Sequence, residues 1–112
     1  VDIDAGGDIW FGSSTDGVYR YDLVDGFTFY NVDNGSGIPG DYIKSVRKDA
    51  DDNIWVATYD DNGVGVYNSS EWLKFDTSFG LGSNFVHYVY VDSQNYKWFG
   101  TQIGGISIYQ NN

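Results

Sequence analysis

The chain has 112 residues, of which 41% are hydrophobic and 19% aromatic, so it can form the core of one small domain and is not intrinsically disordered. Its net charge of −10 excludes the basic surface that binding to nucleic acid or to an anionic membrane requires. It has no Cys, which excludes disulfides and thiol catalysis, and no apolar run long enough for membrane insertion.

The predicted elements are short strands separated by turns rich in Asp, Asn and Gly, and no segment has the periodicity of an amphipathic helix. In chain order the strands form three similar groups. They lie near residues 1–4, 9–13, 18–21 and 27–30, then near 43–49, 53–58, 64–68 and 72–75, and finally near 86–92, 97–101 and 106–109.

The three groups share one sequence pattern in which an Asp precedes a Trp by six residues. Trp10, Trp55 and Trp98 are 45 and 43 residues apart, and Asp4, Asp49 and Asp92 keep the same spacing. Four antiparallel strands in a period of about 40 to 50 residues are typical of a β-propeller blade. We therefore predict an all-β chain of about 2.75 propeller blades, with blade 1 at about 1–42, blade 2 at about 43–85 and an incomplete blade 3 at about 86–112. An antiparallel sandwich or meander is the alternative fold, but it does not explain the repeat.

Burial on both faces is predicted for the strand at 53–58, because its apolar residues are consecutive instead of alternating. The three repeated Trp residues are expected to pack between blades, since a position shared by all repeats serves the shared fold. Trp72 lies outside this series, so we expect it to be partly exposed.

These motifs resemble the two-component regulator propeller repeats. The pattern is Gly-Ile-Pro-x-x-Tyr-Ile-x-Ser-Val at 37–46, Asp-x-x-x-Asn-Ile-Trp-Val-Ala-Thr at 49–58, and Gly-Val-x-Val-Tyr at 63–67. The chain departs from it at 80–82, where a Pro is usual, and in the approach to Trp98. The resemblance implies a ligand-sensing part of a bacterial hybrid sensor kinase, periplasmic or extracellular and often specific for oligosaccharides.

Fewer than three blades leave two apolar faces and open strand edges in water. We therefore expect either a homo-oligomer, closed by head-to-tail contacts, or a piece of a longer propeller that supplies the remaining blades. A structural subunit whose role is self-assembly is the alternative to a ligand-binding module.

Catalytic and metal sites are not indicated by the polar residues. The acidic clusters at 2–8 and 49–52 contain oxygen ligands suited to calcium, but hairpin turns capped by Asp explain them more simply. His87 is the only histidine and is interpreted as an ordinary strand residue. We expect no enzyme activity, no cofactor and no metal.

A candidate ligand site lies where the repeats differ, in the loops and links that meet at one end of a propeller. The predicted residues are aromatic, acidic and amide side chains, a mixture that suits an oligosaccharide or a protein ligand. They are Tyr42, Tyr59, Asp60, Asp61, Asn62, Asn84, Phe85 and Gln102. A solvated loop rim that binds nothing is the alternative.

Overall fold

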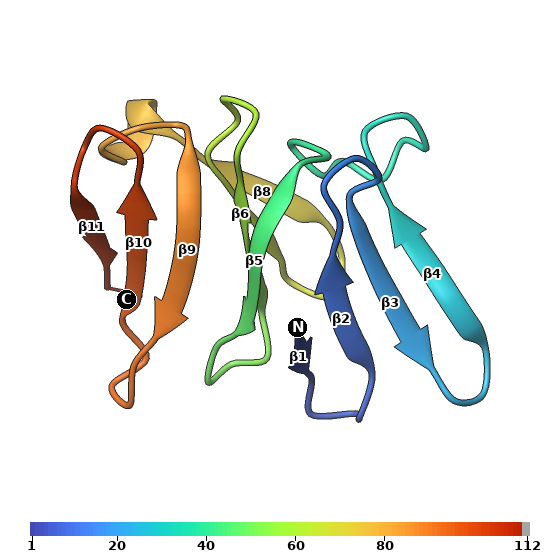
Figure 1. Ribbon diagram of the computed structural model, residues 1–112. Helices are drawn as coiled ribbons and strands as arrows, with labels where there is room; N and C mark the ends of the chain where they lie inside the picture. Colours follow the sequence, from blue (N-terminus) through green and yellow to red (C-terminus); the bar gives the residue numbers. More distant parts are fainter. Residues whose placement is uncertain (111–112) are drawn as a thin grey trace.

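In the computed structural model, which describes residues 1–110, the chain forms three antiparallel sheets stacked side by side (Figure 1). The first sheet has the order β1 (Asp2–Ile3), β2 (Ile9–Gly12), β3 (Val18–Asp22), β4 (Gly26–Tyr30). The second has the order β5 (Ile43–Lys48), β6 (Ile54–Thr58), β7 (Val64–Tyr67), β8 (Trp72–Phe75). The third has the order β11 (Ile106–Tyr109), β10 (Lys97–Thr101), β9 (Val86–Val91).

Each sheet is one propeller blade, and the predicted strands are confirmed. The first strand of each blade lies at the inner edge, where β1 contacts β5 and β5 contacts β9. A three-residue 3-10 helix (Thr77–Phe79) in the link after β8 was not predicted, because one turn carries no periodicity. Within residues 1–110, no helix has the length and apolarity needed to cross a membrane.

Blade 2 is buried on both faces, as its consecutive apolar residues predict. All five residues of β6 are buried, and the first four alternate between two hydrophobic clusters. Ile54 and Val56 face blade 1, whereas Trp55 and Ala57 face blade 3. The two clusters are the interfaces between neighbouring blades, and they form the core of the molecule.

The two interfaces use the same aromatic geometry. Trp10 stacks on Tyr30 with ring centroids 5.6 Å apart, and Tyr67 of the next blade packs 5.4 Å from Trp10. In the second interface Trp55 stacks on Phe75 at 5.7 Å, and Tyr109 packs 5.6 Å from Trp55. The prediction that the repeated Trp residues pack between blades is confirmed for Trp10 and Trp55.

The expected exposure of Trp72 is wrong. Its side chain is buried against Tyr30 and Tyr67, with ring centroids 5.6 and 5.3 Å away. The reason is that the first residue of β8 faces the preceding blade, so it fills the outer end of that interface. Trp98, by contrast, is 37% exposed because no blade among the described residues follows blade 3.

The acidic clusters form hairpin turns, as the turn chemistry predicts. Asp49 accepts hydrogen bonds from the backbone N–H of Asp51 and Asn53 and from the indole of Trp55. The equivalent carboxylates do the same one blade before and one blade after, and the three indole bonds measure 2.9, 2.8 and 2.9 Å. The spacing of six residues between Asp and Trp is therefore set by this bond, which ties each turn to its blade.

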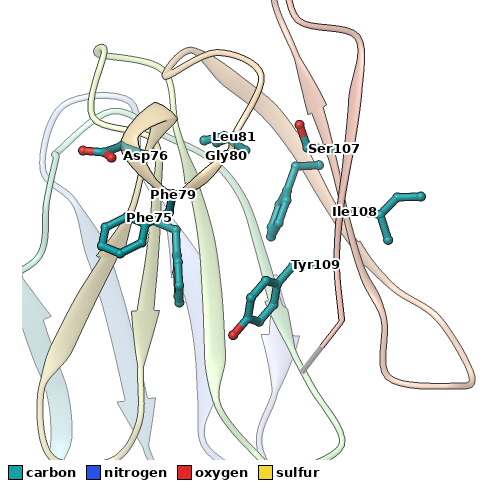
Figure 2. A pocket seen from close by; sticks show the side chains of 9 residues that line it. Phe75, Asp76, Phe79, Gly80, Leu81, Ser107, Ile108 and Tyr109 are labelled. Atoms are coloured by element: carbon teal, nitrogen blue, oxygen red, sulfur yellow. The ribbon is translucent and has the colours of Figure 1, made fainter. Parts of the chain in front are cut away.

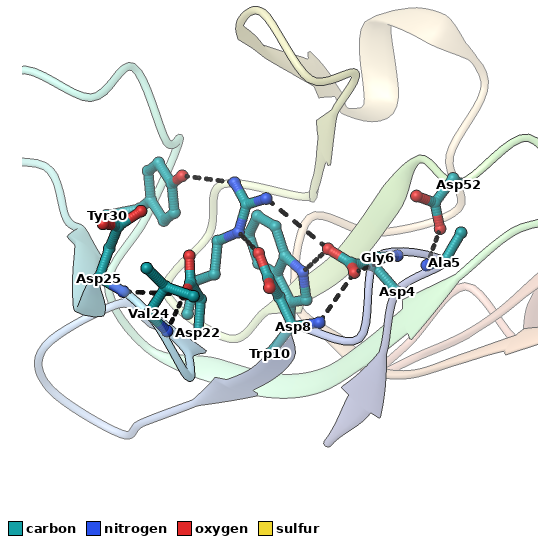
Figure 3. A network of polar contacts seen from close by, with 11 residues as sticks. Asp4, Ala5, Gly6, Asp8, Trp10, Asp22, Val24, Asp25, Tyr30 and Asp52 are labelled. Atoms are coloured by element: carbon teal, nitrogen blue, oxygen red, sulfur yellow. Dashed lines mark hydrogen bonds and ion pairs between the residues drawn. The ribbon is translucent and has the colours of Figure 1, made fainter.

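In blade 1 the turn also holds a cation (Figure 3). Arg20 pairs with Asp8 at 2.8 Å and with Asp4 at 3.8 Å, and its guanidinium lies 4.8 Å from the centre of the Trp10 ring. Burial by itself lowers the pKa of Arg20, but its hydrogen bonds to Tyr30 and Asp8 outweigh burial and raise it. The guanidinium therefore stays charged and offsets part of the negative charge of Asp4 and Asp8.

Candidate functional site

Two β-bulges at the inner edge of the molecule position the basic residues of the candidate site. In β5, Ile43 pairs with Thr58 and Ser45 with Ala57, so Lys44 is an extra, unpaired residue. In β9, Val86 pairs with Thr101 and Tyr88 with Gly100, so His87 is extra in the same way. A bulge redirects the extra side chain, and both of these are exposed instead of packed between blades.

Three of the predicted aromatic residues come together beside these bulges. Tyr59 follows β6, Tyr42 precedes β5 and Phe85 precedes β9, so all three lie at the same end of the sheets. The Tyr59 ring packs edge-on against Tyr42 at 5.7 Å and against Phe85 at 5.4 Å. Tyr59 is therefore the centre of an aromatic cluster that joins blades 2 and 3.

The two bulge residues complete this cluster. The His87 ring lies 4.6 Å from the Tyr59 ring, and the Lys44 ammonium lies 5.3 Å from it. Lys44 also lies 6.0 Å from the Tyr42 ring. The cluster of Tyr42, Lys44, Tyr59, Phe85 and His87 thus combines aromatic faces with hydrogen-bond donors, and we call it the aromatic cluster below.

Backbone hydrogen bonds hold the aromatic residues in place. Tyr59 N–H donates to the carbonyl of Tyr42 at 2.9 Å, and Gln102 N–H donates to the carbonyl of Phe85 at 2.9 Å. The same bond therefore occurs in blades 2 and 3, where it fixes the link before each inner strand to the end of the second strand. The aromatic cluster is built on repeated backbone contacts, although its side chains differ between repeats.

Asp60 and Asn62, which were predicted to bind ligand, are occupied by contacts within the chain. Asp60 accepts hydrogen bonds from the N–H groups of Asp41 and Tyr42, at 3.0 and 3.3 Å. Its other oxygen accepts from the Asn62 amide at 2.9 Å. Gly40 permits this approach, because a Cβ there would overlap the Asp60 carboxylate. Both residues are partly buried, and the Asp60 carboxylate holds the backbone of Tyr42 in position.

The remaining predicted residues are dispersed around the cluster. Asn84 accepts a hydrogen bond from Thr77 N–H at 2.9 Å, which holds the link before β9. Asp61 is exposed at the tip of its loop, in the left-handed region at φ 67°. Gln102 is also exposed, next to Phe85 through the backbone bond.

Lys44 and His87 are the members of the cluster that the sequence prediction missed. Their signal was present, because the two occupy the same position in successive repeats, one residue after the start of an inner strand. An unpaired residue in a bulge cannot be recognised from one sequence, so His87 was interpreted as an ordinary strand residue. Among residues 1–110, no three His, Asp or Glu side chains converge as ligands for a metal ion.

Comparison with known families finds one match within the chain. Residues 37–60 match the family model described as the two component regulator propeller. This segment runs from the link after β4, through β5 and β6, to Tyr59 and Asp60. A search of curated protein sequences finds no significant match.

Solved structures share the fold of nearly the whole chain. The extracellular domain of the putative hybrid two component system BT3049 from B. thetaiotaomicron superposes with a TM-score of 0.75 over 97% of this chain, at 22% identity. The extracellular domain of the putative hybrid two component system BT4673 from the same organism gives 0.75 over 96%, at 21% identity. The chain spans only 16% and 15% of those two chains. The likeness establishes the β-propeller fold, and it corresponds to a short section of much larger domains.

Proposed function

We propose that this chain is a noncatalytic part of a periplasmic or extracellular sensor. It has a β-propeller fold and contains a match to the two component regulator propeller model. In this proposal the aromatic cluster binds the ligand, and the ligand is an oligosaccharide. The family match at 37–60 and the similarity to extracellular domains of putative hybrid two component systems support the sensory role.

The observation that carries the binding proposal is the composition of the aromatic cluster. Tyr42 and Tyr59 offer ring faces and hydroxyl groups, and Lys44 and His87 beside them offer nitrogen donors. A sugar ring presents apolar C–H groups on its faces and hydroxyl groups around its rim, so it can stack on the rings and hydrogen-bond to the donors. The cluster draws on two blades, because Tyr42 and Phe85 both pack against Tyr59.

Calorimetric titration of the chain with a panel of neutral and acidic oligosaccharides tests this proposal. We expect at least one of them to bind, and we expect Tyr59→Ala to weaken its affinity at least about tenfold, a loss of about 1.4 kcal/mol. Tyr90→Ala is the matched control, because Tyr90 is an exposed tyrosine of β9 outside the cluster. Equal affinities for the two variants would show that the aromatic cluster is not the binding site. No binding across the panel would show that the ligand is not one of these oligosaccharides.

Self-assembly is the second candidate function, favoured by the two exposed end faces. Blade 1 presents Phe27 and Phe29, which are 54% and 51% exposed, and blade 3 presents Trp98 and Ile108. These faces correspond to the two sides of an internal blade interface, so copies of the chain can associate head to tail. Assembly that persists while every oligosaccharide fails to bind would favour a structural subunit.

A further inference from the structure

The outer edge of blade 3 differs from the outer edges of the other two blades. In blades 1 and 2 the third strand pairs with a fourth, β3 with β4 and β7 with β8. Among residues 1–110, β11 pairs only with β10, so its outer backbone groups have no strand partner. Unpaired strand edges bind further strands readily.

The register of blade 2 specifies which residues a fourth strand would place opposite β11. Tyr67 pairs with Trp72 and Val64 with Phe75. Tyr109 and Ile106 hold the positions of Tyr67 and Val64, because they pair with the equivalent residues of the second strand. Blade 1 repeats this arrangement, with Tyr21 opposite Phe27 and Val18 opposite Tyr30. In both complete blades the fourth strand therefore carries two aromatic residues three positions apart, Phe27 and Tyr30 in β4 and Trp72 and Phe75 in β8.

A surface pocket lies where the first of these aromatic residues would pack. Trp72 lies against Tyr30, Tyr67 and Gly37, since a Cβ at Gly37 would be 3.9 Å from that of Trp72. The equivalent residues of the next interface, Phe75, Tyr109 and Gly80, line a pocket open to solvent, with an empty volume of about 340 Å³ (Figure 2). Phe79 packs edge-on against Phe75 at its rim and remains 70% exposed.

Three equivalent glycines, one in each blade, show independently that blade 3 has room for a fourth strand. Gly17, Gly63 and Gly105 all have positive φ, at 79°, 79° and 72°. A Cβ at Gly17 would overlap the carbonyl of Tyr30, and one at Gly63 would overlap that of Phe75, each in the fourth strand of its own blade. A Cβ at Gly105 would meet nothing within 4 Å. The backbone of blade 3 thus already has the shape that accommodates a fourth strand.

We propose that the β11 edge binds an extended, antiparallel peptide strand of the pattern aromatic-x-x-aromatic, with the chemistry of β8. Its first aromatic side chain lies opposite Tyr109 and covers the pocket between Phe75 and Tyr109. Its fourth lies opposite Ile106, and its backbone carbonyl there approaches Gly105. This binding is independent of the aromatic cluster, which lies at the inner edge of the blades.

The probe is a peptide copied from residues 68–76, Asn-Ser-Ser-Glu-Trp-Leu-Lys-Phe-Asp, added to the ¹⁵N-labelled full chain. We expect saturable binding, with the amide signals of Ile106–Tyr109 shifting and the N–H groups that face away from β10 becoming protected from hydrogen exchange. The same peptide with its Trp replaced by Ala is the matched control, and we expect it to bind about tenfold or more weakly. Shifts at the outer edges of β4 or β8 instead of β11, or equal binding of the two peptides, would overturn the proposal.

A variant of the chain separates strand addition from adhesion to the pocket. Gly105→Ala meets no atom within 4 Å, so the free chain keeps its fold with only the strain of alanine at positive φ, yet the added methyl group would overlap the carbonyl of an added strand. We expect it to weaken binding of the Trp peptide at least about tenfold, with the unbound amide spectrum otherwise preserved. Gly26→Ala is the control, since Gly26 also has positive φ with nothing within 4 Å but lies in blade 1. Undiminished binding by Gly105→Ala would show that no strand forms along β11.

Discussion

The carboxylates of Asp4, Asp49 and Asp92 make the same hydrogen bonds in three different environments. Asp49 and its ion-pair partner Lys97 are fully buried, and their charged atoms lie 3.3 Å apart. The Lys97 ammonium also lies 5.2 Å from the centre of the Trp55 ring, but it makes no hydrogen bond among the described residues. Ile9 and Ile54 hold the position of Lys97 in the other blades, so this ion pair is specific to the second interface.

Removing Asp49 should therefore destabilise the chain more than removing its counterpart in blade 3. Asp49→Ala leaves a buried ammonium without its counter-ion, and we expect a loss of about 3–5 kcal/mol in the free energy of unfolding, measured by urea titration. Asp92→Ala, the matched control, breaks the same turn and indole bonds near solvent and should cost less. Adding Lys97→Met to Asp49→Ala should restore part of the loss. Equal losses for the two Asp variants would contradict a role for the buried pair.

Acid should weaken the fold through the same three carboxylates. Burial alone raises the pKa of Asp4 and Asp49, but hydrogen bonds from the Trp indole and the turn N–H groups outweigh it and hold both below the usual 3.8. The Trp98 indole is the largest cause of the lowered pKa of Asp92. A depressed folded pKa stabilises the fold above the unfolded value, and that stabilisation is lost as pH falls through the folded pKa.

We expect the free energy of unfolding to fall steeply below about pH 4, because the unfolded chain then takes up protons at these carboxylates before the folded chain does. Urea titrations between neutral and strongly acidic pH measure this, and Asp4→Asn should make the fall shallower. Relief of repulsion among the acidic groups of a chain with net charge −10 acts in the opposite direction. A stability that rises continuously on acidification would show that repulsion outweighs the turn carboxylates.

At the scale of the elements, Gly63 lies in the turn before the third strand of blade 2 and approaches the end of the fourth strand. Gly63 N–H donates to the Asn84 carbonyl, and the Gly63 carbonyl accepts from Thr58 N–H at 3.0 Å. Its positive φ and the nearby Phe75 carbonyl leave no room for a side chain. Gly105 accepts the equivalent bond from Thr101 but has open space around it.

The two glycines should therefore tolerate alanine differently. Gly105→Ala carries only the cost of a left-handed residue, about 1–2 kcal/mol, whereas Gly63→Ala adds an overlap with β8 and should cost more. Thermal unfolding of both variants beside the parent chain measures the difference. If Gly63→Ala proved no worse than Gly105→Ala, the close approach of β8 to this turn would be wrong.

In the molecule as a whole, the outer faces of blades 1 and 3 expose aromatic side chains to solvent. On blade 1, Phe27 packs 4.8 Å from Tyr21 and 6.1 Å from Phe29, and these rings continue across the outer face of the sheet. The same side of blade 2 is buried by blade 1. The outer face of blade 1 is therefore equivalent to one side of the two blade interfaces within the chain, but it is exposed.

We expect the 112-residue chain to self-associate at micromolar concentration through these faces. Sedimentation velocity should show oligomers, and Phe27→Glu together with Phe29→Glu should shift them toward monomer, because charge on the face opposes its burial. Leu23→Glu is the control, since Leu23 is 91% exposed at a hairpin tip beyond the sheet. A monodisperse monomer of the parent chain would contradict association through the blade faces.

The sequence by itself determined the positions of the strands and turns and the propeller fold, because those signals are local and repeated. Asp4, Asp49 and Asp92 each bond to a Trp six residues later in the same blade, so the pattern appears in the sequence as a fixed spacing. The loops that carry Tyr42, Tyr59 and Phe85 were also identified, since they are where the repeats differ.

Burial and side-chain direction were decided only by the tertiary structure, because both depend on the neighbouring blade. Trp72 is buried and Trp98 is partly exposed, although sequence position suggested the reverse, since a blade covers the first and none of the described residues covers the second. Asp60 turned out to hold the Tyr42 backbone, 18 residues away in the sequence. Bulges of one residue redirected Lys44 and His87 toward Tyr59, and pairing between strands, not residue type, determines where such a bulge forms.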